Sequence, residues 1–342
     1  MGQNGLFLTA DMGGTTCRFG LFGIDASLSF TLLKEKLFET ADFVSFAHLL
    51  EAVKASEELF VEGISFVVVA PPAVVDGEVC YPPNIPWGVD VNDVKVALGI
   101  EQILMLNDYM AQGFACMVAG DQNLREMLEI DTIWEGHKQP VPTSPLAVMG
   151  AGTGCGKSVV YPWTKVVLPS EGGHVTFPFK TEEEWAFSRF LQQRICSEVV
   201  SGDDVLGGAG LASLYAFHSG KDLLPIQVGE LFSSGTQKDR DLETTLLWYA
   251  RFFGRFARNF ILDIIPRNGL FITGGVVTHT GVLKHPLFLE TLHNSPTQSE
   301  LLKKIPIFHV RNSRVGIMGC ACFAALVLAS QAEQIPAVMQ PQ

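Results

Sequence analysis

Short apolar runs separated by glycine-rich or polar turns make up much of the chain. Residues 6–10 and 17–24 are predicted to be strands joined by the turn Met12-Gly13-Gly14-Thr15. Residues 28–38 are compatible with a third strand. The run 64–70, apolar except for Ser65, is expected of a central strand in a sheet that is covered on both faces. The first part of the chain therefore predicts a sheet.

The hydrophobic pattern changes to a helical period after this third run. Asp42 is a suitable N-cap, and Phe43, Phe46, Leu50 and Val53 fall on one face of the helix that would follow. Further helices are expected over residues 109–118, 181–199, 246–264 (ended by Pro266) and 315–329. Because these helices alternate with apolar runs, the pattern indicates α/β layers.

Later apolar runs complete the predicted sheets. They lie at residues 102–106, 146–149, 158–161, 270–273 and 305–310. The strand–turn–strand of residues 146–161 repeats the arrangement of the N-terminus, and this weak internal repeat suggests a duplicated fold. Residues 135–145 contain three prolines and a glycine, so they are predicted to form a loop.

Composition narrows the class of protein. A chain of 342 residues that is 47% hydrophobic has enough apolar side chains for two domains. Its formal net charge of −12 disfavours nucleic acid or an anionic membrane as the main partner, although one nucleotide needs only local donors. The apolar stretch 315–329 is too short to span a bilayer.

The cysteines and the N-terminus indicate a cytoplasmic protein. The seven cysteines are odd in number and irregular in spacing, which is typical of reduced thiols rather than a disulfide framework. The sequence has no CxxC pair, so no structural zinc is expected. The first residues lack the basic region of a secretory signal.

The first glycine turn suits an anion accompanied by Mg²⁺. A strand delivers Asp11 to it, Gly13 and Gly14 let the backbone present N–H groups, and Thr15 and Thr16 add hydroxyls. Asp11 would hold the hydrated metal. An ordinary hairpin turn explains the same residues equally well.

The second glycine turn favours a phosphate cradle, since four glycines in residues 150–156 cost backbone entropy without a gain in packing. Residues 151–158 also match a relaxed Walker A pattern. A true P-loop runs into a helix, whereas Lys157 and Ser158 run into strand formers and then Pro162. We therefore interpret Lys157 as a solvent-facing strand residue. Gly274 and Gly275 form a third turn, which fits a nucleotide surface or a plain strand–helix turn.

Polar residues form a further set of candidates. Asn107 and Asp108 follow a buried strand, where ligands of α/β proteins bind, and a carboxylate there can accept the proton of a hydroxyl nucleophile. Asn107 is also a good helix N-cap. Glu171-Gly172-Gly173-His174 offers acceptors and donors to a polyol; a solvated turn is the alternative, and a metal site has too few ligands. Asn84 could add an amide, and Trp87 an apolar wall.

These motifs, in this order, resemble the bacterial-type glucokinases of the actin-like sugar kinase superfamily. The resemblance extends from Leu6 to about Ala329. It assigns phosphate and adenosine contacts to Asp11, Gly13, Gly14, Thr15, Thr16, Gly150, Gly152, Thr153, Gly154, Gly274 and Gly275. It assigns sugar contacts to Asn84, Asn107, Asp108, Glu171 and His174, with Asp108 as the catalytic base.

Two departures from related sequences matter. The ROK group of kinases and repressors carries a zinc-binding cysteine cluster after its Glu-x-Gly-His motif, but residues 176–195 contain no cysteine. The zinc-free, non-ROK group therefore fits better. That group usually has a further sugar-binding Glu before a Val-Leu-x-Gly stretch. Asp203-Asp204 occupies this place here, and we assign the role to Asp203.

The resemblance implies two actin-like (ribonuclease H-like) α/β domains flanking a cleft. A small domain is expected at residues 1–108, with helix 315–330 returning to it, and a large domain at 109–314. The implied activity is transfer of phosphate from ATP, with Mg²⁺, to the 6-hydroxyl of glucose in a cytoplasmic homodimer. The alternatives are a kinase for another hexose or amino sugar and a catalytically weakened, sugar-binding regulator.

Overall fold

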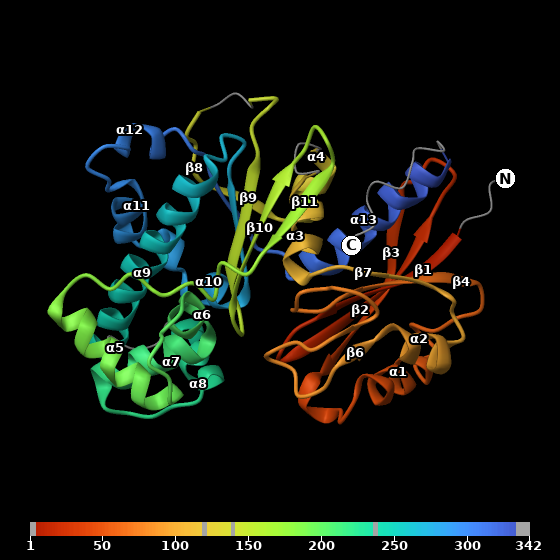
Figure 1. Cartoon of the computed structure of the whole chain (residues 1–342), viewed down its shortest axis with the longest axis horizontal. Coiled ribbons are helices and arrows are strands. Elements are labelled where there is room, and N and C mark those ends of the chain that lie inside the picture. Colours follow the sequence, from red (N-terminus) through yellow and green to blue (C-terminus); the bar gives the residue numbers. More distant parts are fainter. Residues whose placement is uncertain (1–4, 118–121, 138–140, 235–238, 333–342) are drawn as a thin grey trace. The chain divides into compact units, whose positions relative to one another are not determined.

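The chain folds into two compact units, each of which is described by itself (Figure 1). The computed structural model describes residues 5–117, 122–137, 141–234 and 239–332. Unit 1 comprises Met1–Ala119 and Arg314–Gln342, and unit 2 comprises Gly120–Ser313. We expected the boundary at 108/109, but helix α3 (Asp108–Met117) belongs to unit 1 because it packs against α13 (Val315–Ala332).

Unit 1 is built on a five-stranded mixed sheet of order β3-β2-β1-β4-β7. Its strands are β1 (Gly5–Met12), β2 (Thr16–Ile24), β3 (Phe30–Glu39), β4 (Ile64–Ala70) and β7 (Gln102–Met105). β1 pairs with β2 in antiparallel and with β4 in parallel orientation, and β4 pairs with β7 in parallel. All five strands lie in the predicted runs. The two central parallel strands are almost wholly buried because helices cover both faces of the sheet.

The two faces of this sheet carry different helices (Figure 1). Helices α1 (Phe46–Lys54) and α2 (Val91–Leu98) pack with one face around a core that includes Leu8, Phe19 and Val67. The other face meets α13, against which α3 packs. Unit 1 also contains the 3-10 helix η1 (Thr40–Asp42) and a small hairpin of β5 (Val79–Cys80) and β6 (Val89–Asp90).

Unit 2 contains a six-stranded sheet of order β11-β10-β9-β12-β13-β8. The strands are β8 (Ile130–Trp134), β9 (Leu146–Ala151), β10 (Cys155–Tyr161), β11 (Val166–Ser170), β12 (Leu270–Thr273) and β13 (Ile307–Val310). β9, β10 and β11 form an antiparallel meander, and β9 continues into the parallel strands β12 and β13. Both sheets thus join an antiparallel hairpin to parallel strands, as the predicted internal repeat requires.

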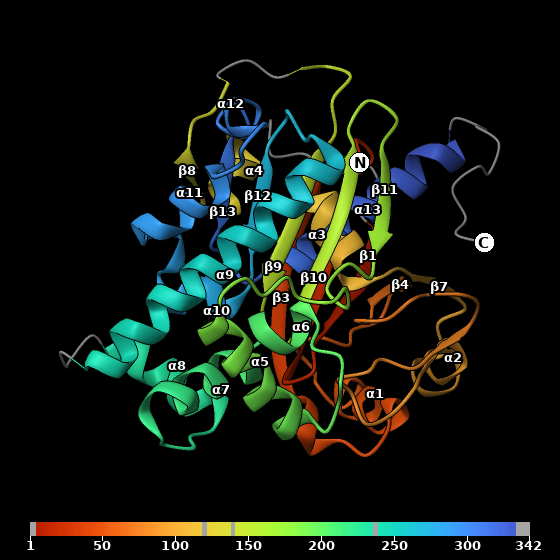
Figure 2. The same ribbon diagram turned by 60° about the vertical axis from the view of Figure 1, so that its left-hand side comes forward.

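A single long helix organises the core of unit 2. Helix α9 (Arg240–Ile264) lies alongside β9 (Figure 2). It buries a row of aromatic side chains and ends just before Pro266, as predicted. The other helices are α4 (Gln122–Met127), α5 (Glu182–Ile195), α6 (Gly202–Leu206), α7 (Gly208–Ser219), α8 (Pro225–Ser234), α10 (Gly275–Thr280), η2 (Val282–Lys284), α11 (Pro286–His293) and α12 (Ser299–Leu302). A buried ion pair between Glu184 and Arg255, with Nη1 and Oε2 2.7 Å apart, joins α5 to α9.

Several helix boundaries differ from the prediction; α9, for example, begins at Arg240 rather than at 246. Helix α1 begins at Phe46, and its N-cap is Ser45, whose side chain accepts a hydrogen bond from the N–H of His48. Asp42 ends η1 instead. Helix α5 stops at Ile195 rather than 199, because Cys196 adopts a left-handed conformation. Of the loop expected at 135–145, residues 138–140 lie outside the described part of the chain.

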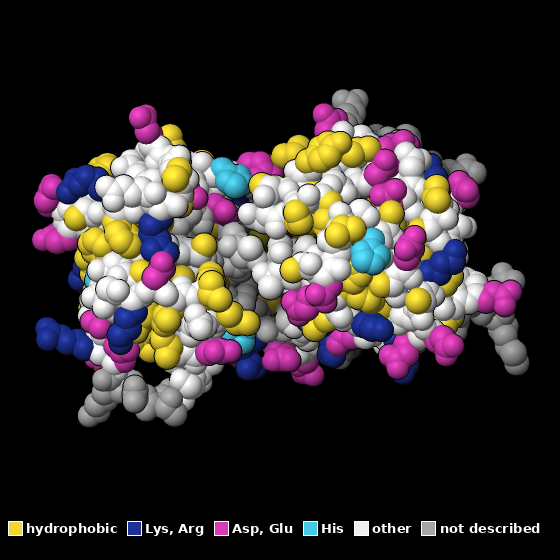
Figure 3. Space-filling model, turned by 90° about the horizontal axis from the view of Figure 1, so that it is seen from below, with side chains coloured by type: hydrophobic (Ala, Val, Ile, Leu, Met, Phe, Trp, Pro, Cys, Tyr) yellow, Lys and Arg dark blue, Asp and Glu magenta, His cyan; other side chains and the backbone are white. Residues whose placement is uncertain are grey.

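Two features bear on the expectations from composition: the distribution of acidic side chains and the apolar character of the helices. Acidic side chains are spread over the face shown in Figure 3 rather than gathered into one patch. Among the described residues, no helix has both the length and the apolar character needed to cross a bilayer.

Candidate functional site

The first glycine turn connects β1 to β2 in unit 1. The N–H of Gly13 donates to the carbonyl of Thr16 at 2.9 Å, and a Cβ on Gly13 would lie 2.8 Å from that oxygen. Thr40, which the sequence did not indicate, supports the turn from η1: its N–H donates to the Thr15 carbonyl and its hydroxyl to the Gly13 carbonyl, both at 2.8 Å. The turn is therefore held from behind, and Thr15 remains exposed.

Asp11 lies at the end of β1, beside this turn. Burial raises the pKa of its carboxyl to about 6, and Arg18, its partner across the β1–β2 pair, opposes the rise. Arg18 is itself paired with Glu35 at 2.9 Å. At neutral pH the carboxylate is ionised but poorly solvated, so a nearby cation would stabilise it. A glycine of α13 makes room for it, since a Cβ on Gly316 would lie 2.1 Å from Oδ2 of Asp11.

Asn107 and Asp108 stand between β7 and α3, where the sequence places them. Oδ1 of Asn107 accepts hydrogen bonds from the N–H groups of Tyr109 (2.9 Å) and Met110 (3.2 Å), so Asn107 is the N-cap of α3. Its Nδ2 donates to the carbonyl of Ala73, and the N–H of Asp108 donates to Pro71. These contacts fix the backbone that carries the Asp108 carboxylate.

Helix α13 carries a buried thiol that the charges of both acids of unit 1 affect. The pKa of Cys320 is raised well above its ordinary value, mainly by burial and also by the charges of Asp11 and Asp108. The remaining candidates of this unit diverge. Asn84 is exposed, whereas Trp87 is a core residue whose indole N–H donates to the Phe43 carbonyl at 3.0 Å.

In unit 2 the second glycine turn connects β9 to β10. The N–H of Gly152 donates to the carbonyl of Gly154 at 2.8 Å, and Thr153 at the tip is exposed. The segment after the turn is strand β10 and not a helix, so this turn is not a P-loop, as predicted. The turn is a tight hairpin.

Other glycines pack directly against this hairpin. Gly274 has a φ of +102°, and a Cβ there would lie 2.2 Å from the carbonyl oxygen of Ala151. A Cβ on Gly207 would lie 2.5 Å from the Thr153 carbonyl, and the N–H of Gly208 donates to Gly152 at 2.9 Å. The structure thus brings the second and third turns together, and it adds Gly207 and Gly208 at the start of α7. In the sequence this glycine pair belongs to the Val-Leu-x-Gly stretch that follows Asp203-Asp204.

Glu171 and His174 lie on one turn and face each other, with Oε2 and Nε2 3.6 Å apart and both side chains half-exposed. Between them, Gly173 passes so close to β10 that a Cβ would lie 1.8 Å from the carbonyl oxygen of Cys155. The turn that carries the two polar side chains is therefore packed against the second glycine turn.

Asp203 joins these two turns, and Asp204 does not. The N–H of Asp203 donates to the carbonyl of Gly173 at 2.8 Å, and its Oδ1 accepts from the N–H of Cys155 at 2.5 Å. Burial raises the pKa of Asp203, while the Cys155 hydrogen bond and His174 oppose the rise. The carboxylate of Asp204 forms the capping box of α6 with Ser201. Asp203 and Asp204 are neighbours in sequence, but they have different hydrogen-bond partners and therefore different roles in the structure.

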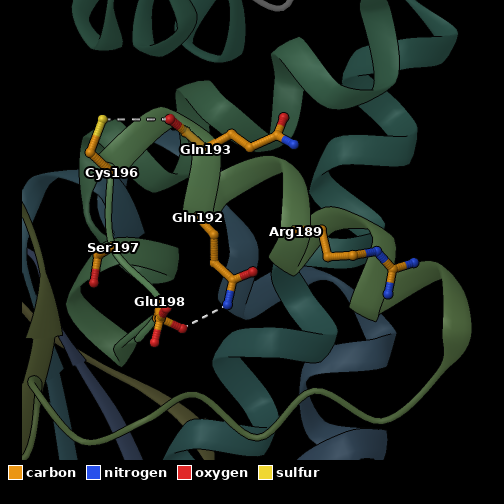
Figure 4. Close-up of a pocket in the computed structure, with 6 residues that line it drawn as sticks. All are labelled: Arg189, Gln192, Gln193, Cys196, Ser197 and Glu198. Atoms are coloured by element: carbon orange, nitrogen blue, oxygen red, sulfur yellow. Dashed lines mark hydrogen bonds between the residues drawn. The ribbon is translucent and has the colours of Figure 1, made fainter.

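Lys157 is buried, so its prediction as a solvent-facing residue was wrong. Only 6% of its surface is exposed, and Nζ lies 3.7 Å from the centroid of the Phe256 ring. A shallow surface pocket at the end of α5 involves none of the candidate residues (Figure 4). Its lining residues are Arg189, Gln192, Gln193, Cys196, Ser197 and Glu198.

Comparison with known proteins points to one family. The model of the Glucokinase family matches residues 8–327. The chain is similar to the glucokinase of Pectobacterium atrosepticum (28% identity, over 94% of this chain and 98% of the relative). It is also similar to that of Nostoc punctiforme (25% identity, over 94% and 99%).

Solved structures agree in fold. The glucokinase of an Antarctic psychrotroph matches with a TM-score of 0.69 at 25% identity, over 93% of this chain and 98% of that one. The glucokinase of Balamuthia mandrillaris, solved in complex with glucose, matches with a TM-score of 0.75 at 16% identity, over 94% of each chain. The second likeness is one of fold alone. Both support the two-domain α/β fold of the actin-like sugar kinases.

Proposed function

The chain belongs to the glucokinase family, and from this premise we propose that it transfers the γ-phosphoryl group of ATP to the 6-hydroxyl of glucose. The observation that carries the proposal is the join between β7 and α3. There, Asn107 caps the helix and fixes the backbone of Asp108 at the carboxyl end of a parallel strand. Ligands of α/β proteins are bound at such strand ends.

Asp108 is the proposed base. Its carboxylate accepts the proton of the sugar 6-hydroxyl while that oxygen forms a bond to the γ-phosphorus and the bond from phosphorus to the β-phosphate oxygen breaks. ADP leaves with the electron pair of the broken bond. Asn107 is proposed to contact the sugar as well. Its Oδ1 is occupied by the helix cap, so the contact would use the remaining N–H of its amide.

The glycine turns are proposed to bind ATP. The residues at the turn of unit 1 are Gly13, Gly14, Thr15 and Thr16, and those of unit 2 are Gly150, Gly152, Thr153, Gly154, Gly274 and Gly275. Their backbone N–H groups and hydroxyls suit phosphate oxygens. Asp11 would hold Mg²⁺ through water, and its buried, raised-pKa carboxylate fits a cation. When bound, this metal neutralises charge on the phosphates.

Glucose is proposed to hydrogen-bond Glu171, His174 and Asp203 of unit 2, in addition to Asn84, Asn107 and Asp108 of unit 1. The absence of cysteine from residues 176–195 supports placement in the zinc-free, non-ROK group. Assembly as a homodimer and a cytoplasmic location stay predictions from the family resemblance.

One observation favours a second candidate, a kinase for another hexose or an amino sugar. Asp203 is shorter than Glu, and one of its oxygens already accepts the N–H of Cys155. The sugar hydroxyl that a longer side chain would bind is then contacted by the other oxygen alone. Such a change alters which hydroxyl orientation is accepted, because a site built to pair with a hydroxyl rejects sugars that leave its polar groups unpaired.

A coupled assay tests both candidates. ADP release is followed with Mg–ATP and, in turn, glucose, mannose, fructose, galactose and N-acetylglucosamine, and the product is identified with glucose-6-phosphate dehydrogenase. We expect the highest kcat/KM with glucose. A higher kcat/KM with another sugar selects the second candidate. No turnover of any of these sugars by a protein that unfolds cooperatively would refute a sugar kinase.

A further inference from the structure

Lys157 occupies an unusual environment for a lysine. It lies in β10, two residues after Cys155, and its side chain points into the core of unit 2. Its Nζ lies 3.7 Å from the ring centroid of Phe256 and 4.9 Å from that of Phe260, both on α9. Within the described chain this ammonium forms no hydrogen bond or ion pair, and burial lowers its pKa. The cation is held by aromatic faces.

The aliphatic part of the same side chain lies under the turn that carries Glu171 and His174. A Cβ placed on Gly172 would be 3.0 Å from Cδ of Lys157 and 3.4 Å from its Nζ. Ser170, which pairs with Lys157 across β10 and β11, accepts the N–H of Gly172 at 3.1 Å. The backbone of the turn therefore lies directly against the end of the Lys157 side chain, because Gly172 has no side chain to separate them.

The ring below Lys157 supports the second sugar-binding element too. A Cβ on Gly202, the first residue of α6, would lie 2.4 Å from Cζ of Phe256. The next residue of α6 is Asp203, whose N–H donates to Gly173. Phe256 thus contacts the start of α6 directly and reaches the Glu171–His174 turn through Lys157. The Phe256 ring therefore supports both the start of α6 and the Glu171–His174 turn.

We propose that Lys157 is a positioning residue for sugar binding: its side chain, with Nζ over the Phe256 ring and Cδ beneath Gly172, holds the Glu171–His174 turn in register with Asp203. The inference rests on the proposed function, since it assumes that this turn binds the sugar. It concerns the side chain's length and packing and assigns no chemical step to the ammonium. A buried lysine without an acceptor costs stability, so its presence beneath this turn calls for a compensating role.

Two substitutions separate length from charge. Lys157→Ala removes the support, whereas Lys157→Met keeps an unbranched chain that packs on aromatic rings without the charge. We expect Lys157→Ala to raise both the KM and the calorimetric Kd for glucose about fivefold to tenfold, because residues in contact couple at this level. The KM for ATP should change less than about twofold. Lys157→Met should restore glucose binding to within about twofold of the wild type.

Val159→Ala is the matched control. Val159 is a buried residue on the same face of the same strand, one pleat further from Gly172. Its truncation should lower the unfolding temperature as Lys157→Ala does, yet leave the Kd for glucose unchanged. Gly172→Ala approaches the same contact from the other side and remains informative if Lys157→Ala fails to fold. Its methyl would lie 3.0 Å from Cδ of Lys157, so it should weaken glucose binding in the wild type and also in the Lys157→Met background, where sulfur occupies the place of Cδ.

The outcomes are distinguishable from failure of the proposed function, because glucose binding is measured by calorimetry without ATP. If the wild type does not phosphorylate glucose, the proposed function fails whatever Lys157 does. An unchanged Kd in Lys157→Ala overturns the inference while the function stands. Equal weakening in Lys157→Met and Lys157→Ala overturns it as well, since the charge and not the chain would then be what matters. Absence of glucose binding by the wild type overturns both.

Discussion

The hairpin turn of unit 1 and that of unit 2 have the same strand–turn–strand form but are built differently. In unit 1 a side chain within the hairpin carries charge, Asp11, and another side chain, Thr40, supports the turn by hydrogen bonds. In unit 2 the hairpin between β9 and β10 carries no acid in its turn. It is shaped instead by the backbone of neighbouring glycines, Gly274, Gly207 and Gly173.

The turn of unit 1 thus depends on side chains, and the turn of unit 2 depends on the packing of the backbone. In the proposed function, the ionisation of two carboxylates of unit 1 matters, namely those of Asp11 and Asp108. Unit 2 contributes surfaces whose exact shape matters, because a Cβ at its glycines would overlap a carbonyl oxygen. Substitutions in unit 1 should therefore act through charge and hydrogen bonding, and substitutions at the unit 2 turns through crowding. The following predictions test this division, beginning with the largest effect.

Asp108→Asn should have the largest effect. The amide can still accept the N–H of Tyr109, as the Asp108 carboxylate does at 2.9 Å, so the start of α3 is preserved. Without a base, kcat should fall by at least about 10²-fold, while the calorimetric Kd for glucose changes little. Glu58→Gln neutralises an exposed acid of the same unit and serves as the control. Near-normal kcat in Asp108→Asn would remove Asp108 as the base.

Gly274→Ala should act through crowding and raise the KM for ATP about tenfold, because a carbonyl oxygen stands 2.2 Å from the new methyl. Gly220→Ala provides the control: that glycine also has a positive φ, +69°, but nothing lies within 4 Å of its Cβ. It should cost about 1 kcal/mol in unfolding free energy and leave the KM for ATP unchanged. Equal effects of the two variants would show that backbone strain, and not crowding, is responsible.

The buried acid of unit 1 should appear in the pH dependence of stability. The folded pKa of Asp11, about 6, lies above the unfolded value of 3.8. The folded state therefore binds more protons between these values, and stability falls as pH rises from about 4 to about 6, by an amount on the order of 1–3 kcal/mol. Asp11→Asn lacks this loss. The difference between its unfolding free energy in urea and that of the wild type should therefore grow, in favour of the variant, between pH 4.5 and pH 7. An advantage independent of pH would contradict the assigned pKa.

Thr40→Val should have the smallest effect. It removes the hydroxyl that donates to Gly13 and should lower kcat/KM for ATP about threefold and the unfolding free energy by about 0.5–1.5 kcal/mol. Thr245→Val in α9 also removes one hydrogen bond of a buried threonine, to the Asp241 carbonyl. It should lose similar stability with unchanged kcat/KM. If Thr245→Val also lowered kcat/KM, the loss of kcat/KM in Thr40→Val would be a result of reduced stability and not of the altered turn.

The sequence predicted best where local pattern determines structure. The runs that form β4 and β12 are apolar except for Ser65 and Thr273, and the predicted bounds match the observed ones. Strand β11 was missed because it lies at an edge of its sheet, leaves Leu168 exposed and contains Pro169. The start of α1 was misplaced since two residues, Asp42 and Ser45, could each cap a helix, and packing decides between them.

The site shows the same limit. The glycine turns and Asn107-Asp108 can be recognised in the sequence from their residue types alone. The burial of Lys157, by contrast, depends on Phe256 and Phe260, which lie on a helix distant in sequence. Likewise, Asp203 and Asp204 look equivalent until the capping box with Ser201 occupies one of them. Thr40 supports the first turn across β3 and carries no local signal at all.

The close contact of α13 with α3 has a consequence for the order in which the protein matures on the ribosome. Ala111 and Gly319 meet so tightly that a Cβ on Gly319 would lie 1.7 Å from the Ala111 carbonyl oxygen. The helix that begins at Asp108 therefore lacks its partner until residues 315–332, which follow the whole of unit 2, have been synthesised. Unit 2 is continuous in sequence and can fold before unit 1 is complete. The glycine turns of unit 2 can thus form before the proposed base of unit 1 has the helix against which α3 packs.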